Sequence, residues 1–122
     1  MTTATKILVV DDDPDILEAV SEILEDAGYC AERADGGPSA LALLRAGLRP
    51  ALMIVDYGMA EMTGSELLAA CSLTPELADI PAVMTSGYRA GELPSDTGDV
   101  VLRKPFPAEQ LLEQVARRVR SR

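Results

Sequence analysis

Three short apolar runs that end in charged residues constrain the fold of this chain more than any other feature of its sequence. The run ILVV leads into Asp11 and Asp12, the run ALMIV into Asp56, and the run VVL into Arg103 and Lys104. A continuous apolar run between polar residues is typical of a strand buried in a parallel sheet. Because open α/β sheets bind ligands at the carboxyl ends of such strands, the sequence predicts carboxylates and an ammonium group clustered at one sheet edge.

Apolar residues between these runs recur at the spacing of amphipathic helices. The first helix is the best marked, because Asp13 can cap it, Pro14 suits its first position and Gly28 can end it. Further helices are predicted over residues 38–46, 64–73 and 107–120, and further strands over residues 29–34, 51–55, 82–85 and 99–102. This alternation predicts a single α/β domain, in which helices cover both faces of a parallel sheet.

The segment between the last two predicted strands is the exception to this pattern. Residues 87–98 should supply a helix, but they contain three glycines and a proline and show almost no apolar periodicity. Glycine and proline both disfavour a helix interior. We therefore expect a loop with at most one or two helical turns, and so a shortened or irregular fourth helix.

The formal net charge of −9 argues against direct nucleic-acid binding by this domain. A group of arginines near the C-terminus is the exception: Arg117, Arg118, Arg120 and Arg122. These arginines suit either the end of a helix, where cations are favourable, or a binding patch. The sequence has neither an apolar run of roughly 20 residues nor a signal-peptide core, so we expect a cytoplasmic location and no membrane partner. Because the chain lacks histidine, Cys30 and Cys71 are not expected to form a zinc site, and we predict that they are unpaired.

The predicted cluster has the composition that magnesium-assisted phosphoryl transfer requires. Asp56 is the candidate nucleophile, because a carboxylate can accept a phosphoryl group as an aspartyl-phosphate. Magnesium prefers oxygen ligands, so we expect Asp12 and Asp56 to bind it directly and Asp11 to act through a water molecule. Lys104 would then neutralise the phosphoryl group from the opposite side.

Two hydroxyl residues stand near the end of the fourth predicted strand. Ser86 is the candidate for a hydrogen bond to a phosphoryl oxygen, and Thr85 is its rival. Simpler roles exist as well, since an aspartate after a strand often caps a helix, which is the role expected of Asp13. A solvated charge at Lys104 and a turn residue at Ser86 are alternatives to their roles in the site.

These motifs together resemble the receiver domain of two-component response regulators. The resemblance rests on four motifs, each at a predicted strand end. In chain order they are VVDDDPD, IVDYGMAEMTG, a hydroxyl residue followed by a small residue, and KPF. The resemblance covers roughly residues 5–120, within a single domain of residues 1–122. It implies a flavodoxin-like (βα)5 fold, a three-layer sandwich whose parallel strands have the order 2-1-3-4-5.

The resemblance also implies a role for each candidate residue. The implied site comprises the phosphoacceptor Asp56, the magnesium-binding pair Asp11 and Asp12, the backbone carbonyl of Gly58, the switch hydroxyl of Ser86, and the active-site Lys104. The phosphoryl group would come from a phospho-histidine on a histidine kinase or a histidine phosphotransfer protein. The bond between Lys104 and Pro105 is expected to be cis, as in the family.

The sequence departs from the family's usual pattern at several positions. Ala60 stands where the family usually has a proline, and Thr63 stands where it usually has an aspartate. Val101 occupies the position of an aromatic residue that often moves together with the switch hydroxyl. That coupled rotation therefore cannot operate in its usual form, and ordering of residues 87–98 on phosphorylation is an alternative way of transmitting the signal.

Three functional classes compete at this point. The leading hypothesis is a phosphorylation-dependent switch that assists its own phosphorylation but is not an enzyme. A pseudo-receiver, which binds a partner without being phosphorylated, is the main alternative. An aspartate-nucleophile phosphatase would need an Asp-x-Asp motif with a threonine two residues later, and although Asp11 and Asp13 fit that spacing, Asp15 occupies the threonine position.

Overall fold

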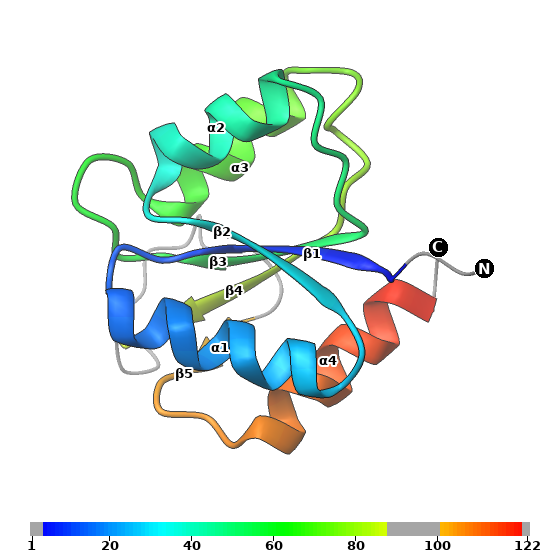
Figure 1. Ribbon diagram of the computed structural model, residues 1–122. Helices are drawn as coiled ribbons and strands as arrows, with labels where there is room; N and C mark the ends of the chain where they lie inside the picture. The colour runs from blue at the N-terminus through cyan, green and yellow to red at the C-terminus, as the bar shows by residue number, and fades with distance from the viewer. Residues whose placement is uncertain (1–3, 88–100, 121–122) are drawn as a thin grey trace.

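The computed structural model describes residues 4–87 and 101–120 and contains one five-stranded sheet. Every pair of neighbouring strands is parallel, and the strand order is β2-β1-β3-β4-β5, as predicted (Figure 1). The strands are β1 (Lys6–Val10), β2 (Cys30–Ala34), β3 (Leu52–Asp56), β4 (Ala82–Ser86) and β5 (Val101–Arg103).

Two layers of helices cover the sheet. The helices are α1 (Pro14–Asp26), α2 (Gly37–Arg45), α3 (Gly64–Ser72) and α4 (Ala108–Arg120). Helices α2 and α3 lie on one face of the sheet, and α1 and α4 lie on the other (Figure 1). The loop predicted in place of a helix between the last two strands falls almost entirely at residues 88–100, outside the described residues. The label α4 therefore refers to the C-terminal helix, the fourth helix among the described residues.

Each face of the sheet has its own apolar core. Alternate residues of a strand point to opposite faces, so the two cores share the strands between them. The core under α2 and α3 includes Leu8, Val10, Leu44, Val55 and Leu67. The core under α1 and α4 includes Ile7, Val9, Leu24, Ile54 and Leu111. Because β3 is buried on both faces, its sequence is an unbroken apolar run rather than an alternation of apolar and polar residues.

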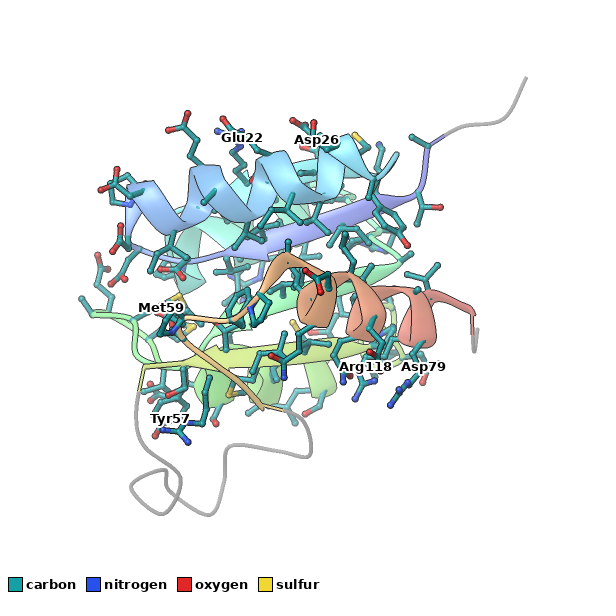
Figure 2. The ribbon with its side chains drawn as sticks, turned by 90° about the horizontal axis from the view of Figure 1, so that it is seen from below. Glu22, Asp26, Tyr57, Met59, Asp79 and Arg118 are labelled. Carbon is teal, nitrogen blue, oxygen red and sulfur yellow. The ribbon has the colours of Figure 1, made fainter. Side chains whose placement is uncertain are left out.

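Helix α1 begins and ends as its sequence predicts. The Asp13 side chain accepts hydrogen bonds from the backbone N–H groups of Asp15 (2.9 Å) and Ile16 (3.4 Å). Gly28 follows the helix with φ of +97°, a conformation that favours glycine. Figure 2 shows Glu22 and Asp26 on the outer side of this helix, pointing away from the sheet.

Helix α4 returns along the sheet after β5. Leu111 and Val115 are fully buried, whereas the exposed Arg117 forms an ion pair with Glu113 one turn earlier, at 2.7 Å. For Arg117 this agrees with the simpler expectation of a cation near the end of a helix. Helix α4 ends at the same side of the molecule at which β1 begins, opposite to the carboxyl ends of the strands (Figure 1).

The state of the cysteines and the length of the helices bear on two further expectations. Cys30 and Cys71 are both free thiols, as predicted. Within residues 4–87 and 101–120, the helices are too short or too polar to cross a lipid bilayer.

Candidate functional site

The carboxyl ends of β1 and β3 bring three aspartates together. Because β1 pairs directly with β3, with Val10 opposite Val55, the residues that follow each position are neighbours. Asp11, Asp12 and Asp56 each offer a carboxylate oxygen, and these oxygens all lie within 4.8 Å of one another. Asp11 and Asp56 are buried, whereas Asp12 is exposed.

Lys104 joins this cluster from the loop after β5. Its Nζ lies 2.9 Å from Oδ2 of Asp11 and 3.0 Å from Oδ1 of Asp56. The Lys104 backbone N–H donates to the carbonyl of Ser86 at 2.8 Å, so the end of β4 fixes the start of this loop. The peptide bond between Lys104 and Pro105 is cis, as expected.

Burial and charge shift the two central ionisable groups. Burial raises the pKa of Asp56 above its ordinary value of 3.8, and the charge of Asp11 adds to this effect. Hydrogen bonds from Lys104 and from the Gly58 backbone oppose the rise only in part. Burial alone would lower the pKa of Lys104, but hydrogen bonds to Asp11 and Asp56 outweigh it, and the pKa stands above its ordinary value. Each partner therefore keeps the other charged in a site where isolated charges are costly.

Three carboxylates facing one ammonium group leave the site with an excess of negative charge. All of the offered donors are oxygen atoms, the ligand type that Mg²⁺ prefers. Proteins commonly relieve such a cluster by binding a cation. The donor set and its charge therefore fit a magnesium ion.

A pocket of about 300 Å³ opens over Asp56 and is lined by Asp56, Gly58, Gly87 and Lys104. Among the described residues, two of the four that line it are glycines, which place no side chain over the carboxylate. Ser86 is fully buried at the end of β4, next to Gly87.

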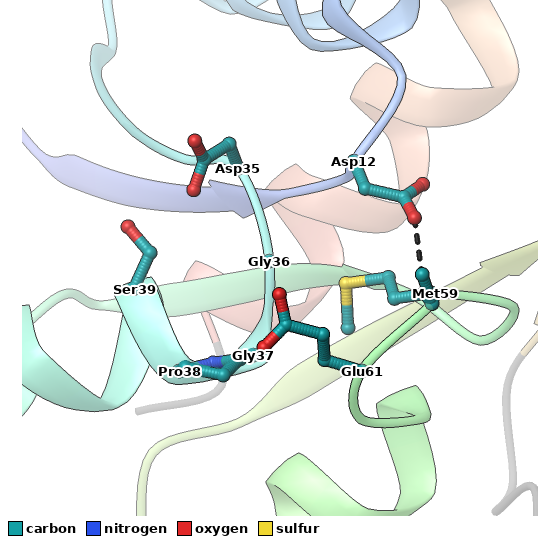
Figure 3. Close-up of a pocket in the computed structure, with 9 residues that line it drawn as sticks. Asp12, Asp35, Gly36, Gly37, Pro38, Ser39, Met59 and Glu61 are labelled. Atoms are coloured by element: carbon teal, nitrogen blue, oxygen red, sulfur yellow. Dashed lines mark hydrogen bonds between the residues drawn. The ribbon is translucent and has the colours of Figure 1, made fainter.

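The loop between β3 and α3 contributes features that our reading of the sequence did not identify. The Ala60 backbone N–H donates to Oδ2 of Asp12 at 3.0 Å, shown as the dashed line in Figure 3. Thr63, one of the departures from the family's pattern, caps α3 through a reciprocal pair of hydrogen bonds with Glu66. The pattern Thr-x-x-Glu before an apolar run is a known signature of such a cap and could have revealed this one.

Gly64 allows α3 to approach the end of β3 closely. A Cβ atom at this position would lie 2.7 Å from the backbone oxygen of Asp56 and 3.0 Å from Cα of Tyr57. The Gly64 N–H also donates to the Tyr57 carbonyl at 2.9 Å, which closes the base of the loop. Only glycine fits here without a shift of the backbone that carries Asp56.

A second pocket of about 300 Å³ lies on the other side of Asp12, between the β3–α3 loop and the start of α2. Asp35, which directly follows β2, and Glu61 line it together with Asp12 (Figure 3). The negative charge at this edge of the sheet thus extends beyond the three clustered aspartates.

Comparison with known proteins finds one family along most of the chain. The response regulator receiver domain matches residues 7–116. The DNA-binding regulator RpaA of Synechocystis sp. is 34% identical over 116 residues, which cover 90% of this chain but 47% of RpaA. The chain therefore spans about half the length of this relative.

Solved structures give the same result. The chemotaxis response regulator CheY4 of Vibrio cholerae is 33% identical, with a TM-score of 0.85 over 95% of this chain and 99% of that one. The signal receiver domain of a histidine kinase from Syntrophus aciditrophicus is 30% identical, with a TM-score of 0.85 over 97% of this chain and 92% of that one. Given these matches, the strand order and the aspartate cluster with its lysine, the chain belongs to the receiver domain family of two-component response regulators.

Proposed function

We propose that this receiver domain is a switch that is set when Asp56 takes a phosphoryl group from a phospho-histidine. The observation that carries the proposal is the position of the Asp56 carboxylate. It lies 3.0 Å from the Lys104 ammonium group and within 4.8 Å of carboxylate oxygens of Asp11 and Asp12. A nucleophile, a cation for the transferred group and ligands for a metal ion thus meet at one edge of the sheet, where a pocket opens over Asp56 and Lys104.

The aspartates divide the task of binding magnesium. Asp11 is engaged by Lys104, so Asp12 and Asp56 are the direct ligands in this proposal, and Asp11 acts through a water molecule. The backbone carbonyl of Gly58 would complete the protein's share of the ligands. Bound Mg²⁺ would supply positive charge that stabilises the phosphoryl oxygens during transfer.

The transfer itself needs little from the protein beyond position and charge. A carboxylate oxygen of Asp56 forms a bond to phosphorus while the bond from phosphorus to the histidine nitrogen of the donor breaks. The electron pair of that bond stays on the imidazole, which takes up a proton as it leaves. The Lys104 ammonium group turns from the Asp56 carboxylate to an oxygen of the bound phosphoryl group, and the Ser86 hydroxyl donates to another.

Receiver domains interact with histidine kinases, and we infer a histidine kinase or a histidine phosphotransfer protein as the partner in the cytoplasm. Direct binding of nucleic acid or membrane by the domain is not part of the proposal. Receiver domains are switches rather than classical enzymes, and the product stays on the protein. Ordering of residues 87–98 on phosphorylation stays a prediction, because these residues lie almost entirely outside the described part of the chain.

Intact mass after incubation with a small phosphodonor tests the proposal. We expect a gain of one phosphoryl group that requires magnesium, and we expect no gain for Asp56→Asn, which keeps the shape of the side chain. Asp26→Asn removes an exposed carboxylate far from the site and should behave as the wild type. If magnesium binds but no mass is gained, the chain is a pseudo-receiver that works without phosphorylation.

A further inference from the structure

The described residues hold the buried Asp11 and the exposed Asp12 of the site in different ways. Asp11 is held by the Lys104 ammonium group at 2.9 Å and by the Asp13 backbone N–H at 2.9 Å. Among residues 4–87 and 101–120, the hydrogen-bond partner of the Asp12 side chain is the Ala60 N–H, at 3.0 Å. The two residues are 48 positions apart, so this bond joins two separate loops (Figure 3).

Asp12 needs such a contact more than its neighbours do. Its side chain is exposed, and an exposed aspartate samples several rotamers in water. It nevertheless presents an oxygen within 4.8 Å of those of Asp11 and Asp56. A metal ion that met a freely rotating Asp12 would have to order it, and that ordering would weaken binding.

The loop that supplies the N–H is held in place along its length. The Tyr57 N–H donates to the Thr85 carbonyl at 2.8 Å, and the Gly64 N–H donates to the Tyr57 carbonyl at 2.9 Å. Met59, directly before Ala60, is buried in the core under α2 and α3. The donor is therefore presented from a backbone that is fixed at both ends of the loop.

We propose that the backbone N–H of Ala60 is a positioning group that holds the Asp12 carboxylate ready to bind magnesium. The proposal rests on the magnesium site proposed above. A hydrogen bond to one carboxylate oxygen orients the group and leaves lone pairs for the metal, as partners of metal ligands commonly do. Gly58, whose backbone carbonyl is a proposed ligand, stands two residues earlier in the same loop.

The identity of residue 60 decides whether this bond exists. Any residue except proline provides the N–H at this position, and proline removes it. Ala60 is also one of the places where the sequence departs from the family's usual pattern. The departure thus adds a donor to the metal site, although the alanine side chain brings no chemistry of its own.

The test compares Ala60→Pro with Ala60→Ser, which keeps the N–H and is close in size, in the full 122-residue chain. Calorimetric titration with Mg²⁺ should show dissociation constants about tenfold higher for Ala60→Pro, the low end for groups that orient metal ligands. The serine variant should match the wild type. Phosphorylation of Ala60→Pro by a small phosphodonor should need a higher magnesium concentration to reach half of its maximal rate. The maximal rate at saturating magnesium should be unchanged.

A second variant guards against a distorted loop, because proline also restricts Met59 before it. Lactic acid in place of Ala60, introduced by in vitro translation, turns the N–H into an ester oxygen and adds no restriction. We expect it to weaken magnesium binding as the proline does. In the Asp12→Ala variant, which lacks the acceptor, the Ala60 amide proton should resonate upfield of its position in the wild type.

Each failure has a distinct meaning in this experiment. Unchanged magnesium affinity in the ester variant would overturn the positioning role of Ala60. An equal loss in Ala60→Ser would assign the effect to the side chain and overturn the role as well. If the wild type itself bound no magnesium, the proposed metal site would fail instead.

Discussion

At the scale of single residues, Asp56 combines a functional requirement with an electrostatic cost. In its proposed role as the nucleophile Asp56 must stay charged, yet burial and the neighbouring Asp11 raise its pKa. A carboxyl group whose pKa is raised in the folded state stabilises the fold below its ordinary value of 3.8. That contribution is lost as the pH rises through the raised folded-state pKa.

This cost predicts that Asp56→Asn is more stable than the wild type at pH 7 in magnesium-free buffer. The advantage should shrink as the pH falls towards 3.8, because the wild-type carboxyl group then becomes neutral as well. Urea unfolding at several pH values measures the difference in the free energy of unfolding. A less stable variant at pH 7 would mean that the ion pair with Lys104 outweighs the burial of the charge.

The hydroxyl residues show how far single residues can be assigned from sequence. The position at the end of the strand and the family resemblance both favour Ser86 over Thr85, and the structure buries both residues at the end of β4. In the sheet register Thr85 lies opposite Asp56, and Ser86 lies opposite Arg103. The assignment of Ser86 as the switch hydroxyl therefore stays a prediction.

At the scale of elements, the strands and α1 were predictable because their signals are local. Unbroken apolar runs marked β1 and β3, and the Asp13–Pro14 pair marked the start of α1. The contact between Ala60 and Asp12 was not predictable in the same way. It joins residues 48 positions apart and depends on the path of a loop, which hydrophobic periodicity does not encode.

The close approach of α3 to β3 gives a prediction at this scale. Gly64→Ala should destabilise the domain by about 1–3 kcal/mol, because the new methyl group meets the Asp56 backbone at 2.7 Å. The displaced backbone should also slow phosphorylation of Asp56. Gly87→Ala is the matched control, since a Cβ atom there meets nothing within 4 Å and should change stability by less than about 0.5 kcal/mol.

Thermal unfolding, followed by circular dichroism, measures stability in the two variants, and intact-mass kinetics measure the rate of phosphorylation of Gly64→Ala against the wild type, because Gly87 itself lines the pocket over Asp56. An equal loss of stability at the two glycines would point to a general cost of replacing glycine. In that case the contact between α3 and the Asp56 backbone would carry no special weight.

At the scale of the whole molecule, a ligand that binds only the folded domain should raise its stability. Magnesium at about 100 times its dissociation constant should add about 2.7 kcal/mol to the free energy of unfolding. Asp12→Ala should remove most of this gain and cost little stability without magnesium, because the Asp12 side chain is exposed. Sodium chloride at matched ionic strength separates specific binding from general screening.

A gain of equal size in sodium chloride would show that magnesium acts only by screening the negative charge of the chain. The same gain in Asp12→Ala would place the ion elsewhere on the molecule. Either result would contradict the proposed site.

The ends of the described chain lie on the side of the sheet opposite to the carboxyl ends of its strands (Figure 1). This follows from the winding, because the five strands run parallel away from that side and the described helices carry the chain back. A receiver of this shape can be spliced into a longer polypeptide at either end, or between two other domains, as one uninterrupted insert. The flanking chain would enter and leave on the far side, so in each of these arrangements it would leave the pocket over Asp56 facing away from the points of attachment.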